Sequence, residues 1–156
     1  MNVAVIKMCN DRPFYARSRG LKVVVAIDDS PHSSRLIEAV SHRKWPEHTE
    51  FKILAVLEPI ECCVDADEWQ ETMTAANAKR KHAAEDYCQH ARQKLMDKVT
   101  PASVHFEIRL GDPKEEIVSA ASQWHADKIM MGAHSKGVCP HNLLGSVSRA
   151  VSQNAP

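Results

Sequence analysis

Short apolar runs alternate with longer amphipathic segments along this chain. The first clear run, residues 23–27, contains only Val, Ala and Ile. A run without polar alternation is typical of a strand that is buried on both faces of a parallel sheet. Further strands are predicted over residues 51–57, 104–110 and 127–131, and each predicted strand is followed by a helix that begins near residues 31, 67, 113 and 145.

The resulting order of elements is β-α-β-α-β-α-β-α. This alternation predicts a single α/β domain of Rossmann-like type, in which helices cover both faces of a doubly wound parallel sheet. We expect the strand order 3-2-1-4, with the strictly apolar first strand in the interior of the sheet. In the long second helix, apolar side chains with a period near 3.6 predict the buried face: Trp69, Met73, Ala76, Ala83, Tyr87, Ala91 and Leu95.

The first twenty residues do not continue this pattern. The apolar stretch at residues 3–6 is too short for a secretory signal, and residues 10–20 carry three arginines with little apolar content. We therefore predict a flexible tail over residues 1–20 and one domain over residues 21–156. No segment approaches the roughly 20 apolar residues of a membrane span, so no membrane partner is expected.

Composition narrows the classes of partner. The 20 basic and 20 acidic residues give no net charge, which argues against a nucleic-acid partner because such proteins normally present a basic face. Five cysteines without a C-x-x-C pair indicate free thiols in a reducing, cytoplasmic compartment. Nine histidines form no H-x-x-x-H or H-E-x-x-H unit, so no protein-held metal site is predicted.

Two predicted strand ends carry residues suited to ligand binding. Asp28 follows the first strand, and Gly132 ends the fourth, before a loop that leads to Gly145 and Ser146 at the start of the last helix. In open α/β sheets, ligands bind beyond the carboxyl ends of the strands. Glycine permits a close backbone approach, and a helix N-terminus attracts anions. The alternative is a tight turn followed by a helix cap.

Four segments of the chain resemble the universal stress protein family: residues 23–30, 111–113, 127–132 and 143–148. The resemblance covers about residues 21–156. The ATP-binding branch of that family is similar to G-x-x-G, nine residues, then G-S/T. Gly132, Gly145 and Ser146 match this pattern, whereas Ser135 stands where the second glycine is expected.

This resemblance implies an ATP site. Asp28 would lie at the adenine-ribose end, with Val56 and Met131 beside the adenine. The ribose and phosphates would be surrounded by Gly132, His134, Ser135, Gly145, Ser146, Val147 and Ser148. Mg²⁺ or Mn²⁺ on the phosphates is an implied companion. No Walker motif and no nucleophile-base set is present, so we expect no catalytic residues and at most a weak ATPase.

Two departures from the family pattern keep alternatives open. Ser135 is expected to weaken ATP binding without abolishing it. It also favours an alternative hypothesis, in which the protein is a nucleotide-free dimerisation or interaction module. The usual last strand of the family is missing after the final helix. We therefore expect an open sheet edge along residues 128–131 and a homodimer formed there. Asp28 as a simple turn cap and His134 as a solvated loop residue are the corresponding alternatives at single positions.

Overall fold

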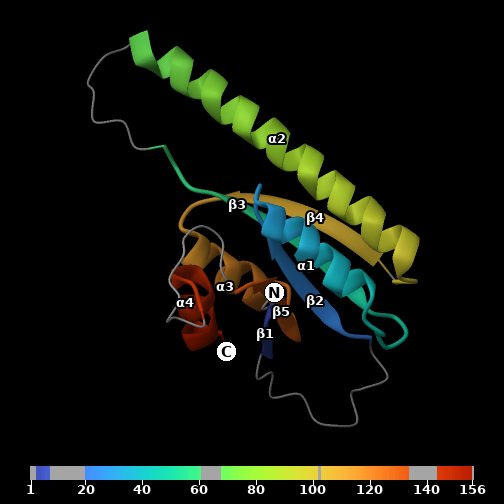
Figure 1. Cartoon of the computed structure of the whole chain (residues 1–156). Coiled ribbons are helices and arrows are strands. Elements are labelled where there is room, and N and C mark those ends of the chain that lie inside the picture. The colour runs from blue at the N-terminus through green and yellow to red at the C-terminus, as the bar shows by residue number, and fades with distance from the viewer. Residues whose placement is uncertain (1–2, 8–19, 61–67, 102, 134–143, 156) are drawn as a thin grey trace.

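The computed structural model describes residues 3–7, 20–60, 68–101, 103–133 and 144–155 (Figure 1). Strands and helices alternate as predicted, with one additional strand at the start. The elements are β1 (Val3–Lys7), β2 (Lys22–Ile27), α1 (Pro31–Ser41), β3 (Glu50–Leu57), α2 (Glu68–Lys98), β4 (Ser103–Leu110), α3 (Pro113–Gln123), β5 (Lys128–Gly132) and α4 (Ser146–Asn154).

The sheet has the order β1-β5-β2-β3-β4. The strands β2, β3, β4 and β5 are parallel to one another, and their order is the predicted 3-2-1-4. Val23, Val24 and Val25 of β2 are fully buried, because a central strand of a doubly wound sheet is covered on both faces. The α/β fold class predicted from the sequence is thus confirmed.

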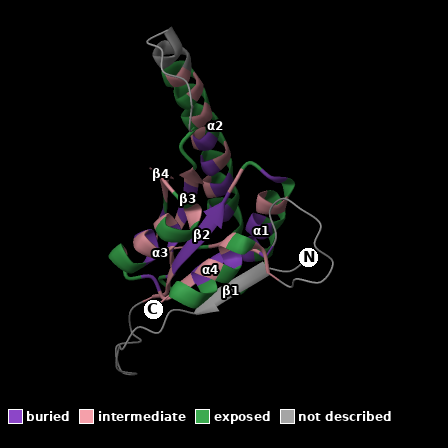
Figure 2. Cartoon of the chain, turned by 90° about the vertical axis from the view of Figure 1, so that its left-hand side faces the viewer, coloured by how far each residue is buried: buried purple, intermediate pink, exposed green. Residues whose placement is uncertain are grey.

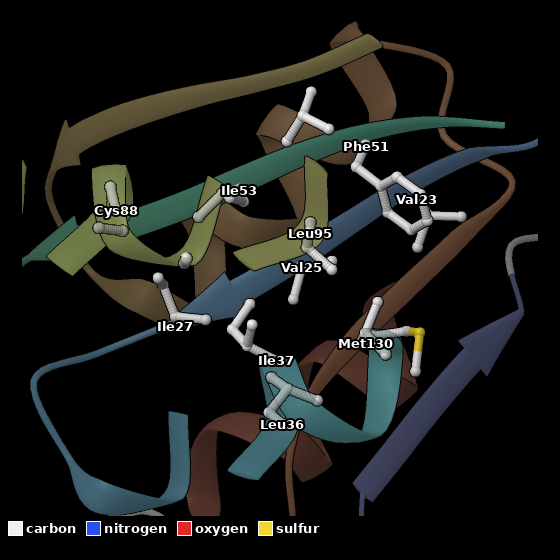
Figure 3. Packing of buried hydrophobic residues seen from close by; sticks show 14 of the residues in the cluster. Val23, Val25, Ile27, Leu36, Ile37, Phe51, Ile53, Cys88, Leu95 and Met130 are labelled. Carbon is white, nitrogen blue, oxygen red and sulfur yellow. The ribbon is translucent and has the colours of Figure 1, made fainter. Parts of the chain in front are cut away.

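Two separate hydrophobic clusters lie on the two faces of the sheet. On one face, Val25 and Ile53 pack against α1 and against Cys88 and Leu95 of α2 (Figure 3). On the other face, Val24 and Leu54 pack with residues of α3 and α4. Alternate residues of one strand therefore serve different cores, which explains the uninterrupted apolar run.

The strand β1 corrects the predicted N-terminal tail. Residues 3–7 are not a loose segment, because they pair antiparallel with β5 from Val3 opposite Gly132 to Lys7 opposite Lys128. The edge along residues 128–131, expected to recruit a second copy, is covered by the same chain. The arginine-rich part of the predicted tail, residues 8–19, lies outside the described residues. The apolar run at residues 3–6 has only four residues, too few to be recognised as a strand without its partner.

The helix α2 extends well past the sheet (Figures 1 and 2), and its buried face is rotated from the predicted one. Ala91 and Leu95 are buried as predicted, but Ala84 and Cys88 complete the stripe. Ala83 is exposed and Tyr87 is half-buried. A helix with alanine at both 83 and 84 does not reveal from its sequence which of the two faces the sheet.

The starts of α1 and α3 are capped in different ways. Asp112 caps α3, because its side chain accepts a hydrogen bond from the backbone N–H of Lys114 at 2.8 Å. Ser30 precedes Pro31 at the start of α1 but makes no side-chain cap. Its hydroxyl donates instead to Asp28. Helix α1 ends at Ser41, and His42 forms its C-cap.

Charged side chains tie the outer strand β4 to its neighbours. The carboxylate of Glu107 accepts from Lys52 Nζ at 2.7 Å and from Arg109 Nε at 2.6 Å. Burial alone would raise the pKa of Glu107, but these hydrogen bonds hold it below its ordinary value. Arg109 also reaches Glu116 and Gln123 of α3. This network fixes β4 against the helix that covers it.

Candidate functional site

A cavity of about 480 Å³ lies beyond the carboxyl ends of β2, β3 and β5. The chain leaves β2 toward β3 on one side, and β5 pairs with β2 on the other, so the strand order reverses here. A crevice at such a reversal is where open α/β sheets bind ligands. Its volume falls within the roughly 300–1,000 Å³ of small-molecule sites. Apolar groups from the strand ends form its floor: Ala26, Ile27, Leu54, Val56, Leu57 and Met131.

One wall of the cavity is formed by the end of β5 and the start of α4. The carbonyl oxygen of Ala133 accepts from the N–H of Gly145 at 2.6 Å and from the hydroxyl of Ser148 at 2.9 Å. These contacts join the two ends of the segment that separates β5 from α4. Ser148 is buried, and its hydroxyl oxygen also lies 3.1 Å from the carbonyl oxygen of Gly145. Its hydroxyl is therefore used to hold the wall together.

The first turn of α4, beside this junction, holds N–H groups without an acceptor among the described residues. The first N–H with a partner inside the helix is that of Arg149, which donates to the carbonyl oxygen of Gly145. The N–H groups of Ser146, Val147 and Ser148 precede it and have no acceptor within the helix. Gly145 and these three residues all line the cavity. Such groups, with the positive end of the helix dipole, suit an anionic ligand.

Asp28, at the end of β2, is held in a tight turn. Its Oδ1 accepts from the N–H of Ser30 at 3.1 Å, the hydroxyl of Ser30 at 2.5 Å and the hydroxyl of Ser33 at 2.6 Å. The N–H of Asp28 donates back to Ser33 Oγ at 2.8 Å. The turn-cap interpretation thus has direct structural support. Asp28 also lines the cavity, so the carboxylate combines a structural position with access to a ligand.

The opposite wall comes from α2, with Arg80, Ala83 and Tyr87. Burial, with nearby Cys88, Asp29 and Asp28, raises the pKa of Tyr87 to about 12, while Arg80 acts in the opposite direction. The phenol therefore stays neutral at physiological pH and can donate a hydrogen bond. Tyr87 was predicted only as a core residue, and its half-buried ring also packs against the first hydrophobic cluster.

The described residues contain no group of three or more His, Cys, Asp and Glu side chains arranged to hold a metal ion. Cys88 is buried and has a pKa raised to about 12 by desolvation, which makes it a poor nucleophile at neutral pH. None of the helices in the described part of the chain combines the length and apolar character of a membrane span.

Comparison with known proteins identifies the family. The family model described as the universal stress protein family matches residues 21–156. The chain belongs to this family. No curated protein matches the sequence of the chain.

Solved structures of universal stress proteins share the fold. The universal stress protein UspA from Lactobacillus plantarum is 17% identical with a TM-score of 0.70, over 88% of this chain and 94% of that one. The protein MJ0577 is 25% identical with the same TM-score, over 86% and 90%. A universal stress protein in complex with cAMP is 18% identical with a TM-score of 0.58, over 87% and 92%.

In this universal stress protein, one cavity gathers most of the residues predicted for the nucleotide site. They are Asp28, Val56, Met131, Gly132, Gly145, Ser146, Val147 and Ser148. His134 and Ser135 lie outside the described residues. For all ten predicted positions, these two included, contact with a nucleotide remains a prediction. The contribution of Arg80 to the α2 wall was missed, because Arg80 stands in a run of basic residues, 79–82, of the kind that is typical of a solvated helix surface.

Proposed function

We propose that this universal stress protein binds an adenine nucleotide, ATP, in the cavity between β2, β5 and α4. The observation that carries the proposal is the joining of an apolar floor to a helix N-terminus at the strand-order reversal. An apolar floor suits a base, and free N–H groups suit phosphates. A structurally similar family member has been solved in complex with cAMP, which supports an adenine nucleotide here.

Each part of the ligand has a suitable wall. Val56 and Met131 supply the apolar contacts for the adenine, and Asp28 offers a carboxylate acceptor for ribose hydroxyls. Gly132, Gly145 and the first turn of α4 face the phosphates. The hydroxyl of Ser148 is already used by Ala133, so we assign its N–H, rather than its side chain, to the phosphates.

Binding, rather than hydrolysis, is the proposed activity. Mg²⁺ or Mn²⁺ would be carried by the phosphates, since no cluster of protein ligands exists among the described residues. The occupied state would act in stress response or signalling by changing which partners bind. A cytoplasmic location follows from the cysteine usage and stays a prediction.

A homodimer is also proposed, but not through β5. Because β1 pairs with that edge, a second copy would have to use another surface, such as the outer edge of β1. Replacement of a motif glycine by Ser135 favours the second candidate function, an interaction module without a nucleotide.

A calorimetric titration with ATP, AMP and adenosine separates the two functions. The nucleotide proposal predicts saturable binding of one ATP per chain, with ATP tighter than adenosine because only the nucleotide reaches α4. No heat of binding for any of the three ligands at millimolar concentration would leave the interaction module as the function.

A further inference from the structure

Arg80 presents a guanidinium group at the wall of the cavity opposite α4. It lies on α2 and lines the cavity. It is outside the four segments whose sequence resembles the universal stress protein family. Its Nη1 donates to the backbone carbonyl oxygen of Glu58 at 2.9 Å. Glu58 follows directly after β3, so this contact holds the side chain over the strand ends.

Among the described residues, this contact engages only one nitrogen of the guanidinium. A guanidinium has five N–H donors and no acceptor, so most of its donors are left for a ligand. Arg109 differs in this respect, because all three of its guanidinium nitrogens donate hydrogen bonds, to Glu107, Glu116 and Gln123. A tethered guanidinium with remaining donors suits recognition of an anionic group.

The charged residues of the described cavity lining are mostly acidic. Three of them, Asp28, Asp29 and Glu58, carry carboxylates. The N-terminus of α4 contributes the equivalent of only roughly half a positive charge. Among the described lining residues, Arg80 is the one lysine or arginine. Without Arg80, every formally charged residue of the described lining would be acidic, which would oppose the entry of a phosphorylated ligand.

We propose that Arg80 is a specificity-determining residue that makes the cavity accept anionic ligands. This inference rests on the proposed nucleotide function and deepens it. The guanidinium, held by the Glu58 carbonyl, offsets the lining carboxylates and adds a positive charge that attracts a phosphorylated ligand. The uncharged nucleoside gains little from it. Selectivity for a nucleotide over its nucleoside thus comes from both walls of the cavity, α2 and α4.

The same helix supplies a matched control. Lys81 is exposed, follows Arg80 directly and does not line the cavity. Arg80→Gln and Lys81→Gln remove the same formal charge from adjacent positions. Their comparison separates a local effect at the cavity from a general change in the charge of α2, which salt screens beyond about 10 Å at 0.1 M ionic strength.

The experiment is a calorimetric titration of the parent and both variants with ATP and with adenosine, after melting curves show that all three are folded. Arg80→Gln should weaken ATP binding by about tenfold, because a positive charge that attracts the phosphates is lost, and adenosine binding by less than about twofold. Lys81→Gln should change either affinity by less than about twofold.

Two results would overturn the inference while leaving the nucleotide function intact. One is an ATP affinity in Arg80→Gln that equals that of Lys81→Gln. The other is an equal loss for ATP and adenosine, which would assign Arg80 to the shape of the wall. If the parent binds neither ligand, the proposed function fails together with the role of Arg80.

Discussion

The hydroxyl of Ser148 lies 2.9 Å from the carbonyl oxygen of Ala133, fifteen positions earlier in the chain. The same carbonyl accepts from the N–H of Gly145. One oxygen atom at the end of β5 therefore holds the start of α4 in place. The N–H groups proposed to bind phosphate owe their position to this junction.

Replacing Ser148 by Ala tests the junction. Because Gly145 still satisfies the Ala133 carbonyl, we expect the free energy of unfolding to fall by only about 1 kcal/mol. Binding of ATP should weaken more than binding of adenosine, since the phosphate wall is loosened. Urea denaturation and calorimetry measure the two effects. Ser152→Ala, at an exposed position on the same helix, is the control and should leave both unchanged. If the two variants had the same stability and the same ATP affinity, the Ser148 hydroxyl would have no role in holding the phosphate wall.

Asp28 has two roles that two variants can separate. Asp28→Ala removes the carboxylate and the turn, so both nucleotide affinity and melting temperature should fall, the affinity by the equivalent of about 1–3 kcal/mol. Ser33→Ala removes only the hydrogen bonds between Ser33 and Asp28. It should lower the melting temperature with a smaller loss of affinity. If Ser33→Ala reproduces the full loss of affinity, Asp28 acts through the turn alone.

The β4 network makes a prediction about pH. The pKa of Glu107 is lowered in the folded state, so its contribution is present above the unfolded pKa of about 4.3 and is lost as pH falls through the lower folded value. At pH 7, Glu107→Gln should reduce the free energy of unfolding by about 1 kcal/mol, a value that allows for solvent screening. The side chain is 32% exposed.

Urea denaturation at pH 7 and pH 3 measures the change at Glu107. The difference between the parent and Glu107→Gln should shrink at pH 3. Glu47→Gln, at an exposed position after α1, serves as the control and should show little difference at either pH. A constant difference across this range would show that the network does not act through the charge of Glu107.

Deletion of residues 1–7 tests the role of β1. The deletion would leave the N–H and C=O groups of the β5 edge unpaired, which invites pairing with a second chain. We expect a lower melting temperature and a larger mass in sedimentation at micromolar concentration than for the parent. An unchanged mass together with an unchanged melting temperature would mean that β1 contributes nothing to this edge.

The sequence predicted the interior of this fold better than its borders. Residues 23–27 could be assigned to a central strand because burial on both faces leaves no polar position. The strand β1 could not, since its pairing with β5 depends on residues more than 120 positions away. The face of α2 was also misjudged, because adjacent alanines carry no information on which side is buried.

Some residues of the candidate site could be predicted from the sequence and others could not. Asp28, Gly132 and Gly145 were found because strand ends and helix starts have local signals. Arg80 was not found, because its place at the cavity results from how far α2 extends over the strand ends. Ser148 was predicted to lie beside the ribose and phosphates, and its place in the cavity fits that prediction. The internal hydrogen bond of its buried hydroxyl to the Ala133 carbonyl could not be predicted from the sequence.

Hydrogen exchange with and without saturating ATP reports both whether the nucleotide binds and where it binds. If it binds in the proposed cavity, we expect slower exchange in the first turn of α4, residues 146–149, and around residues 26–33 and 131–133. Exchange in β4 should be unchanged, since that strand lies at the far edge of the sheet. Absence of any change at millimolar ATP, or slowing confined to β4, would contradict the proposed nucleotide site.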